Sequence, residues 1–393
     1  MPNNRIFYAC QAVALEPLYD NAGVLSPTTN GVQILHGVQS VGLNTTFNLE
    51  QVFELGQIHI YENIEGVPDV EVTLEKVLDG YPLMYHVATC GVDEESLSDS
   101  AKLSLVARSK QRTNVYLGIF PDTVENIGDS NAAASVEVQM SGMYVSSIGY
   151  TFPVDGNCTE SLTLVGNHKA WSTSPSKFTS TVADDLNVTG GDTNNQVDSP
   201  MNLQTSTPYG GIQRRENVDI KNSILPQSIY GVSQNSLPGN AYANGAPKVH
   251  VQNCSISCDL NRESIQELGR KAPYYRFANF PVEVTCEFEV IAVSGDFVSA
   301  YEEGKASYVG TINVGNNTAE ETIVVRLHDG SVFDLGTKNR LSSVNYTGGD
   351  AGGGNATMTY SYSTYNSLTV THPKDLIDVP DNPAYNPAYN GTI

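Results

Sequence analysis

The sequence predicts a mainly β protein made of two tandem domains, each a small β-barrel or sandwich with a short α-helix. The composition favours strands joined by turns, because 21 Tyr residues accompany abundant Val, Thr, Ser, Asn and Gly. Several segments alternate apolar and polar residues, which is the period of a strand with one buried face. The phrase NLEQVFELG at 48–56 returns as NRESIQELG at 261–269, which indicates an internal repeat.

The two copies show the same matches in the same order along the chain. The matched pairs are VQSVGLNTTFNLEQVFELG (38–56) with VQNCSISCDLNRESIQELG (251–269), EVTLE (71–75) with EVTCE (283–287), VSSIGYT (145–151) with LSSVNYT (341–347), and SLTL (161–164) with SLTV (367–370). Matches that keep one order predict two copies of one domain.

The repeat divides the chain into five parts. The two domains are expected at 30–185 and 247–375, with an N-terminal arm at 1–29 before them. The segment 186–246 is rich in Ser, Asn and Gly and predicts a linker or an extended loop. The segment 376–393 repeats NPAY and predicts a flexible C-terminal tail.

Each copy of the repeated phrase is interpreted as a short capped helix. Asn48 and Asn261 can accept hydrogen bonds from the first-turn amides, and Gly56 and Gly269 can adopt the left-handed conformation that ends a helix. A helix of two turns is unstable alone, so its apolar side chains must dock on a sheet. These side chains are Val52 and Leu55 in the first copy, and Ile265 and Leu268 in the second.

The strand that follows each phrase has one apolar and one acidic face. Such an alternation favours a solvated sheet face over an acid/base or metal site. The residues of the polar face are Glu71, Thr73 and Glu75 in the first copy, and Glu283, Thr285, Glu287 and Glu289 in the second.

The sequence contains no pattern that indicates catalysis, a cofactor or a bound metal. The six cysteines are scattered, and Cys254 and Cys258 would lie about 13 Å apart on one strand, too far to share a zinc ion. The seven histidines show no metal-binding spacing, and no nucleophile elbow or phosphate loop occurs. We therefore expect a protein that is not an enzyme, with no catalytic, cofactor-binding or metal-binding residues.

The charge and hydropathy patterns argue against two classes of protein, nucleic-acid-binding proteins and membrane proteins. With a formal net charge of -22, the chain lacks the excess of basic residues that stable nucleic-acid binding requires. No window approaches the roughly 18 apolar residues of a membrane span, and the N-terminus shows no signal peptide.

The run VGLNTTFNLEQVFELGQIHIYENIEGVPDVEVTLEKVLDG (41–80) resembles the first half of bacteriophage tail tube proteins, and YVSSIGYTFPVDGNCTESLTLVGNHKAW (144–171) resembles the second half. The second copy lacks a clear equivalent of GNCTESLTLVGN (156–167). The resemblance implies subunits that close into six-fold rings, with strands of neighbours joined into a continuous inner β-barrel. Rings of this kind stack into a hollow tube through which the genome passes.

The resemblance therefore implies a structural virion protein of a phage tail tube, a conduit for DNA during ejection, assembled in the host cytoplasm. Its partners would be further copies of itself and sheath, baseplate or terminator proteins, with DNA passing without sticking to an acidic lumen. The candidate lumen-facing residues are those of the two polar strand faces: Glu71, Thr73, Glu75, Glu283, Thr285, Glu287 and Glu289. Three chains could make a pseudo-six-fold ring, or six chains could do so if only one copy lines the lumen. The alternatives are another self-assembling viral protein, such as a capsid, decoration or tail adaptor protein, or an adhesin-like β-protein.

Overall fold

The computed structural model describes residues 5–21, 24–27, 32–56, 58–89, 104–123, 133–178, 211–220, 223–230, 242–243, 246–247, 250–292, 320–349 and 354–372. The predicted C-terminal tail lies outside these residues, as does most of the predicted linker. The chain is mainly β, which confirms the predicted fold class. Among the described strands, no sheet closes on itself into a barrel.

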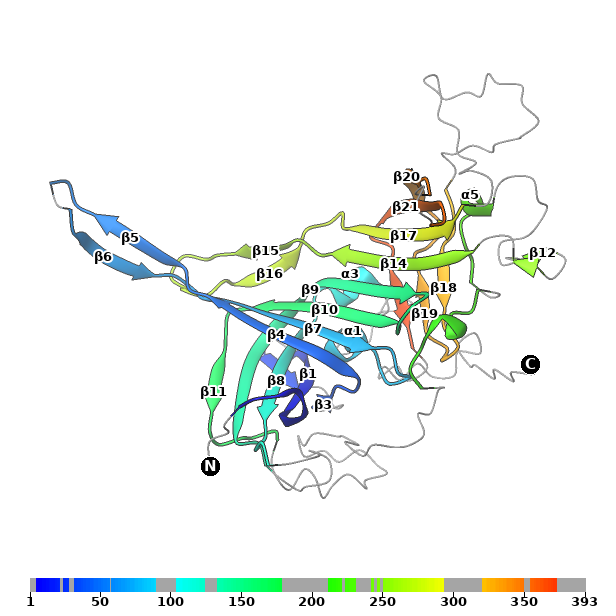
Figure 1. Cartoon of the computed structure of the whole chain (residues 1–393). Helices are drawn as coiled ribbons and strands as arrows, with labels where there is room; N and C mark the ends of the chain where they lie inside the picture. The colour runs from blue at the N-terminus through cyan, green and yellow to red at the C-terminus, as the bar shows by residue number, and fades with distance from the viewer. Residues whose placement is uncertain are drawn as a thin grey trace.

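One long antiparallel sheet forms the centre of the molecule (Figure 1). Its strands follow the order β4-β7-β10-β9-β14-β17-β21-β20. Their bounds are β4 Val38–Thr46, β7 Asp69–Val77, β9 Val136–Pro153, β10 Thr159–Gly166, β14 Val251–Asp259, β17 Glu283–Ile291, β20 Arg340–Thr347 and β21 Thr357–Tyr365.

The strand β9 belongs to two sheets, because its first half turns away to pair with β8. The second group of strands comprises β1 (Gln11–Asn21), β2 (Val24–Pro27), β3 (Gln33–Ile34), β8 (Arg112–Ile119) and β11 (Ala170–Ser172). Gly142 has a φ of +64° in this turn of β9, and its amide donates to Asn114 Oδ1 at 3.0 Å. This group lies below the long sheet in Figure 1 and packs against its apolar face.

The first four strands of the long sheet have the same order as the last four. We call β4, β7, β10 and residues 144–153 of β9 the first unit, and β14, β17, β21 and β20 the second unit. The pairing registers place Val41 opposite Leu74 in the first unit and Cys254 opposite Phe288 in the second. A residue in the first strand of the second unit is therefore numbered 213 above its counterpart in the first unit, and a residue in the next strand is numbered 214 above.

The two units also carry β-bulges at corresponding positions. In the first strand of each unit, one residue has no cross-strand partner in the register. This residue is Gln39 in β4 and Gln252 in β14, which are 213 positions apart. The same holds in the last strand for Ser146 in β9 and Ser342 in β20, an offset of 196. The sequence matches at these two offsets are thus the ones that the strand pairing reproduces.

Two other sequence matches do not correspond in the structure. SLTL lies within β10, whereas SLTV lies at β22 (Thr369–Thr371), which pairs with β19 in a separate small sheet. The strand that corresponds to β10 is β21. Similarly, the strand pairing aligns Leu74 with Phe288 and not with Cys286. A shift of two residues preserves which side chains face inward, so the alternation could not reveal it.

The predicted helices at 48–56 and 261–269 are wrong, because each phrase forms a β-hairpin. The first phrase begins the hairpin of β5 (Leu49–Phe53) and β6 (Ile60–Glu65), and the second begins that of β15 (Arg262–Ile265) and β16 (Tyr275–Ala278). A nine-residue helix has little stability of its own, whereas each phrase here pairs with a strand about ten residues further on.

The predicted cap residues consequently have other roles. Gly56 and Gly269 do have positive φ angles, +92° and +85°, but in hairpin turns. Asn48 caps no helix; its side-chain amide donates to Val67 O at 2.8 Å and to Asp69 Oδ2 at 3.0 Å. Asn261 has a φ of 42°, and its backbone amide donates to Asp259 Oδ1. The predicted docking residues Val52, Leu55, Ile265 and Leu268 lie on the two hairpins. Leu55, Ile265 and Leu268 are exposed, so their predicted docking on a sheet is wrong: with no helix formed, they have no helix face to dock.

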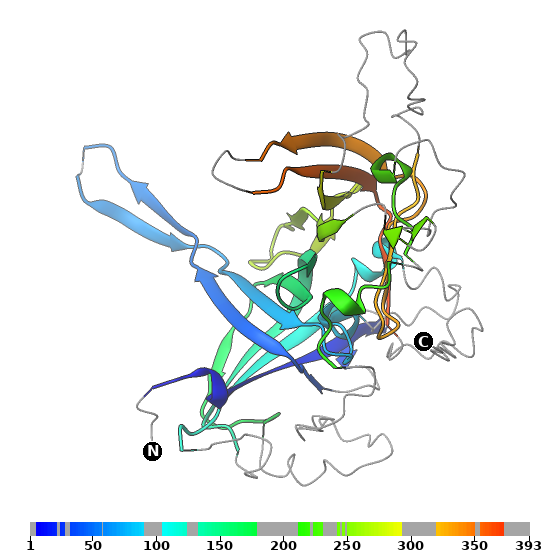
Figure 2. The same ribbon diagram turned by 45° about the vertical axis from the view of Figure 1, so that its right-hand side comes forward.

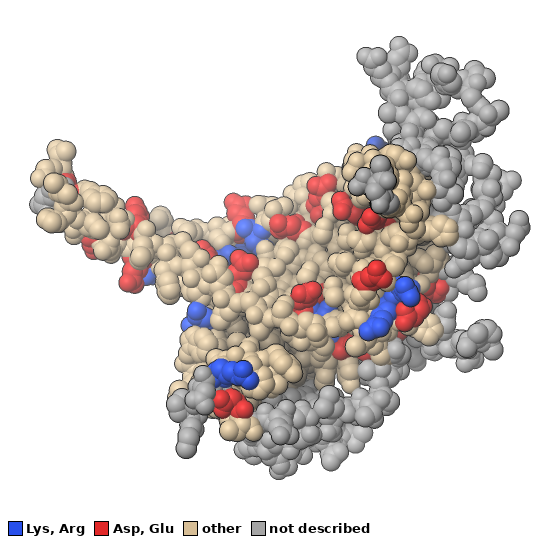
Figure 3. Space-filling model, in the orientation of Figure 1, with Lys and Arg blue, Asp and Glu red and all other residues tan. Residues whose placement is uncertain are grey.

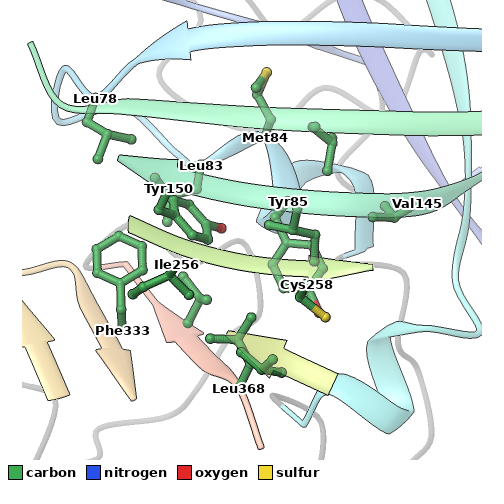
Figure 4. Close-up of a cluster of buried hydrophobic side chains, with 14 of the residues drawn as sticks. Leu78, Leu83, Met84, Tyr85, Val145, Tyr150, Ile256, Cys258, Phe333 and Leu368 are labelled. Carbon is green, nitrogen blue, oxygen red and sulfur yellow. The ribbon is translucent and has the colours of Figure 1, made fainter. Parts of the chain in front are cut away.

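The core lies between the long sheet and the elements that cover its apolar face. Covering elements include α1 (Met84–Thr89), α3 (Leu105–Arg108) and the small sheet of β18 (Val324–Arg326), β19 (Val332–Asp334) and β22. Figure 4 shows side chains of both units meeting in this cluster. The ring of Phe333 lies 4.6 Å from that of Tyr150 and 5.2 Å from that of Phe152. The two units therefore share one core.

Part of the predicted linker packs into this structure. The amide of Gln213 donates to Leu78 O at 2.7 Å, and Ile224 forms a β-bridge with Val324. The remaining elements are the short α5 (Gln227–Tyr230), the 3-10 helices Tyr8–Cys10 and Arg215–Asn217, and the hairpin of β12 (Tyr242–Ala243) and β13 (Ala246–Pro247). No helix in the described ranges has the length and apolar character needed to cross a membrane.

A buried carboxylate joins α1 to the long sheet. Glu160 on β10 is fully buried and accepts from the amides of Met84 at 2.7 Å and Tyr85 at 3.0 Å. The hydroxyl of Tyr150 donates to the same carboxylate at 3.2 Å. Desolvation raises the pKa of Glu160 above its ordinary value, although these hydrogen bonds oppose the rise.

We expect Glu160→Ala to lower the free energy of unfolding by about 3 kcal/mol, because buried donors lose their acceptor. Glu160→Gln keeps the size and one acceptor oxygen, so it should lose less. Because the folded state has the higher pKa, the wild type should lose stability as pH rises from about 4.5 through the folded pKa, and the Gln variant should not. Urea unfolding at several pH values measures both effects; equal pH slopes for the two proteins would contradict the assignment.

Candidate assembly surface

The acidic faces of β7 and β17 lie on one side of the long sheet. Cross-strand partners share a face in an antiparallel sheet, so the side can be followed from strand to strand. Glu75 is opposite Ser161, Ser161 is opposite Gly149, and Gly149 is opposite Ser257. Ser257 is opposite Thr285, and their hydroxyl oxygens are 2.6 Å apart.

All seven residues predicted for a polar sheet face therefore lie on this side. Their neighbours in sequence point into the core, where Val72 and Cys286 are fully buried. Glu71, Thr73, Glu75, Glu283 and Glu287 are exposed, and Thr285 and Glu289 are partly buried. We call this side of the long sheet the acidic face.

The acidic face holds small polar residues between its carboxylates. On this side of the strands from β4 to β21 there is no Lys or Arg; the first one met is Arg340, on the edge strand β20. Figure 3 shows acidic side chains along the upper margin of the body, in the part of the view that β17 occupies in Figure 1. Among the described residues, the hairpin of β15 and β16 covers this side at Tyr144, whereas the opposite face carries the main apolar core.

The joint between the two units is a backbone ladder between β9 and β14. Seven residue pairs run from Asn253 opposite Pro153 to Asp259 opposite Ser147. On the core side of the ladder, Ile148, Tyr150, Ile256 and Cys258 are all buried. The joint is thus a complete strand pairing with a packed apolar underside.

The two outer strands of the long sheet have no such partner among the described residues. In this sheet β4 pairs only with β7, and β20 pairs only with β21. The corresponding side chains are less buried than in the joint: Tyr346 is 55% exposed, whereas its counterpart Tyr150 is 1% exposed. Leu43 and Val344, the counterparts of Ile256 and Ile148, are only partly buried. We call β4 and β20 the free edges.

The sequence contained a signal for these edge residues that its interpretation missed. The repeat alignment already paired Tyr346 with Tyr150 and Leu43 with Ile256. Strand order was needed to see that one member of each pair is covered within the chain and the other is not. Trp171, the single tryptophan of the sequence, lies exposed on β11.

The described residues contain no cluster of three His, Cys, Asp or Glu side chains placed to bind a metal ion. Cys254 and Cys258 are free thiols on the core side, and burial raises the pKa of Cys258 to about 12. A cavity of about 240 Å³ lies between the start of β14 and the segments 215–220 and 223–225; its lining is largely apolar and includes Arg215 and His250.

No family model and no curated protein matches the sequence. A chain of the baseplate of the anti-feeding prophage matches 44% of this chain and 97% of its own length, with 12% identity and a TM-score of 0.27. A chain of the sheath-tube complex of an extracellular contractile injection system matches 43% and 92%, with 10% identity and a TM-score of 0.26. Hcp1 from Flavobacterium johnsoniae matches 40% and 98%, with 11% identity and a TM-score of 0.17. TM-scores below 0.5 do not establish a common fold.

The free edges should differ from the joint in hydrogen exchange. In the isolated chain, we expect the outward-pointing amides of β4 and β20 to exchange at least about a hundredfold faster than those of β9 and β14, because only the latter are bonded on both sides. Hydrogen–deuterium exchange read by mass spectrometry measures this ratio. Equal protection of all four strands would show that the edges are covered within the chain.

Proposed function

We propose that this protein is a structural subunit of a tail-type tube. Its chains join edge to edge into closed rings, the rings stack, and the acidic face lines a channel through which DNA passes. The observation that carries this proposal is the joint between β9 and β14, which links two units of one topology and leaves the corresponding edges open.

The joint supplies a template for contact between chains. In each unit the first strand and the last strand form the two edges, and β9 and β14 use one edge of each. The remaining edges, β20 and β4, are the counterparts of β9 and β14. The same register transferred between chains places Leu43 opposite Tyr346, Asn44 opposite Asn345, and Thr45 opposite Val344. The exposed Tyr346 would then be buried as Tyr150 is.

Head-to-tail contacts of this kind close into a ring when the rotation fits, and closure removes every free edge. Both units lie in one sheet with their acidic faces on the same side, so both would line the same channel. The resemblance to tail tube proteins implies six units per ring. Six units with equal roles correspond to three chains.

The acidic face is the side suited to line an open channel, because the apolar face is covered by the core and its outer elements. A lumen of carboxylates and small polar residues repels phosphates, and the cation that its strands carry on this side is Arg340, on the edge strand β20. DNA could therefore slide along it. Under this proposal the protein resides in the virion tail after assembly in the host cytoplasm, and sheath, baseplate or terminator proteins contact the rings.

A disulfide test follows from the transferred register. The double variant Asn44→Cys/Asn345→Cys places thiols on directly opposed residues of neighbouring chains, within the Cα separation that a disulfide needs. Mild oxidation should link chains, as seen on a denaturing gel without reductant. The native cysteines in the described residues are buried and should not interfere.

The matched control for this test is Asn44→Cys/Thr347→Cys, which keeps both thiols on the acidic face but shifts one by two residues. It should link chains at least about tenfold more slowly, because diagonal positions lie roughly 7–8 Å apart. Equal linking in both variants, or none in either, would reject the proposed edge contact.

A charge test addresses the channel. The triple variant Glu71→Lys/Glu75→Lys/Glu287→Lys should make assembled rings bind short duplex DNA, with an affinity that falls steeply as salt rises. The control Glu50→Lys/Glu263→Lys/Glu267→Lys makes the same charge change on the two hairpins. Fluorescence anisotropy of labelled DNA compares them; equal gains in affinity would show that the acidic face is not a distinct DNA path.

A further inference from the structure

The hairpin of β5 and β6 projects from the body in both Figure 1 and Figure 2, and we call it the arm. Every residue of β6 is exposed, as are all but one of β5. The arm exposes many large apolar side chains, and an isolated two-stranded hairpin is only marginally stable in water. These exposed residues are Phe47, Leu49, Phe53, Leu55, Ile58, Ile60, Tyr61 and Ile64.

The corresponding hairpin of the second unit is docked within the chain. Its register is the same, because Leu49 pairs with Glu65 as Arg262 pairs with Ala278, both at the offset of 213. This hairpin, β15–β16, lies against the first unit next to the joint. The two hairpins thus correspond residue by residue, but only one has a binding surface in its own chain.

Three side chains fasten β15–β16 to the first unit. Arg262 donates from Nε to Val145 O at 2.8 Å and lies over the ring of Tyr144. Tyr275 packs edge-on against Tyr144 with ring centroids 5.4 Å apart. Arg276 forms an ion pair with Asp69 at 2.6 Å. In the same chain, this contact lies beside the pairing of β14 with β9.

The same offsets locate the surface that the arm would meet on a neighbouring chain. Tyr144 and Val145 of β9 correspond to Arg340 and Leu341 of β20, at the offset of 196. On the arm, Glu62 corresponds to Tyr275 and Leu49 corresponds to Arg262. An aromatic pair within the chain is therefore replaced, between chains, by the opposite charges of Glu62 and Arg340.

We propose that the arm of one chain docks across the β20 end of the neighbouring chain, with Glu62 facing Arg340 and Leu49 lying over the backbone of Leu341. This contact rests on the proposed ring and adds a second fastening beside its strand pairing. Its occupant is a second copy of this chain, because the geometry of docking is copied from β15–β16 and the charges are complementary. Within the described part of the chain, the side chain of Arg340 is 63% exposed and forms an ion pair with the exposed Glu320 at 3.6 Å.

Charge reversal tests the contact in the full-length protein. Glu62→Arg and Arg340→Glu should each raise the protein concentration needed for half-maximal ring formation by about five- to tenfold, as expected when an exposed attraction becomes a repulsion. The double variant should return to within about twofold of the wild type. Sedimentation velocity measures ring formation, and far-UV circular dichroism verifies that each variant is folded.

The control is Glu50→Arg, the same change on the same arm at a position whose counterpart Glu263 is exposed in the docked hairpin. It should stay within about twofold of the wild type. If Glu62→Arg behaves like this control, or if the double variant assembles no better than the single ones, the docking is rejected. If the disulfide between positions 44 and 345 still forms in that case, the ring survives and only the arm contact fails. Absence of both rings and disulfide would reject ring and docking together.

Discussion

The backbone ladder between β9 and β14 is the constraint on which the rest of this structure depends. It converts two four-stranded units into one continuous sheet and buries Tyr150 and Ile256 beneath the joint. A strand edge is otherwise a row of unpaired amides and carbonyls that invites uncontrolled pairing. A chain that satisfies one pair of edges internally and leaves the matching pair open has a defined way to add the next chain.

The two hairpins differ in the same way as the two pairs of edges: β15–β16 is docked within the chain, and the arm is not. The docked β15–β16 uses Arg262, Tyr275 and Arg276, whose hydrogen bonds and ring contacts are made within the chain. The arm keeps the same register but carries Leu49, Glu62 and Asn63 at these positions. The two units therefore differ at the three positions through which β15–β16 contacts its own chain. In contrast, the bulges at Gln39 and Gln252, which lie within the sheet, occupy corresponding positions in the two units.

Sequence reasoning predicted the parts of this fold that depend on local patterns. The period of two identified β7 and β17 and placed Glu71 and Glu287 on a solvated face. The positive φ of Gly56 was also predicted, but it was assigned to a helix end because β6 had not been identified as a pairing strand. The free edges could not be predicted, since edge status depends on strand order, which no local pattern encodes. The mismatch of SLTV with SLTL has the same origin, because four residues of similar type carry no information on topology.

The central claim is that the joint within the chain is repeated between chains until the sheet closes. The mass of the isolated assembly tests it most directly, by native mass spectrometry of purified protein at low salt. The account predicts a closed ring of three chains of 42.3 kDa each, about 127 kDa in total, found singly or in stacked multiples. A stable single chain, or a continuous series of oligomers with no preferred end, would contradict it.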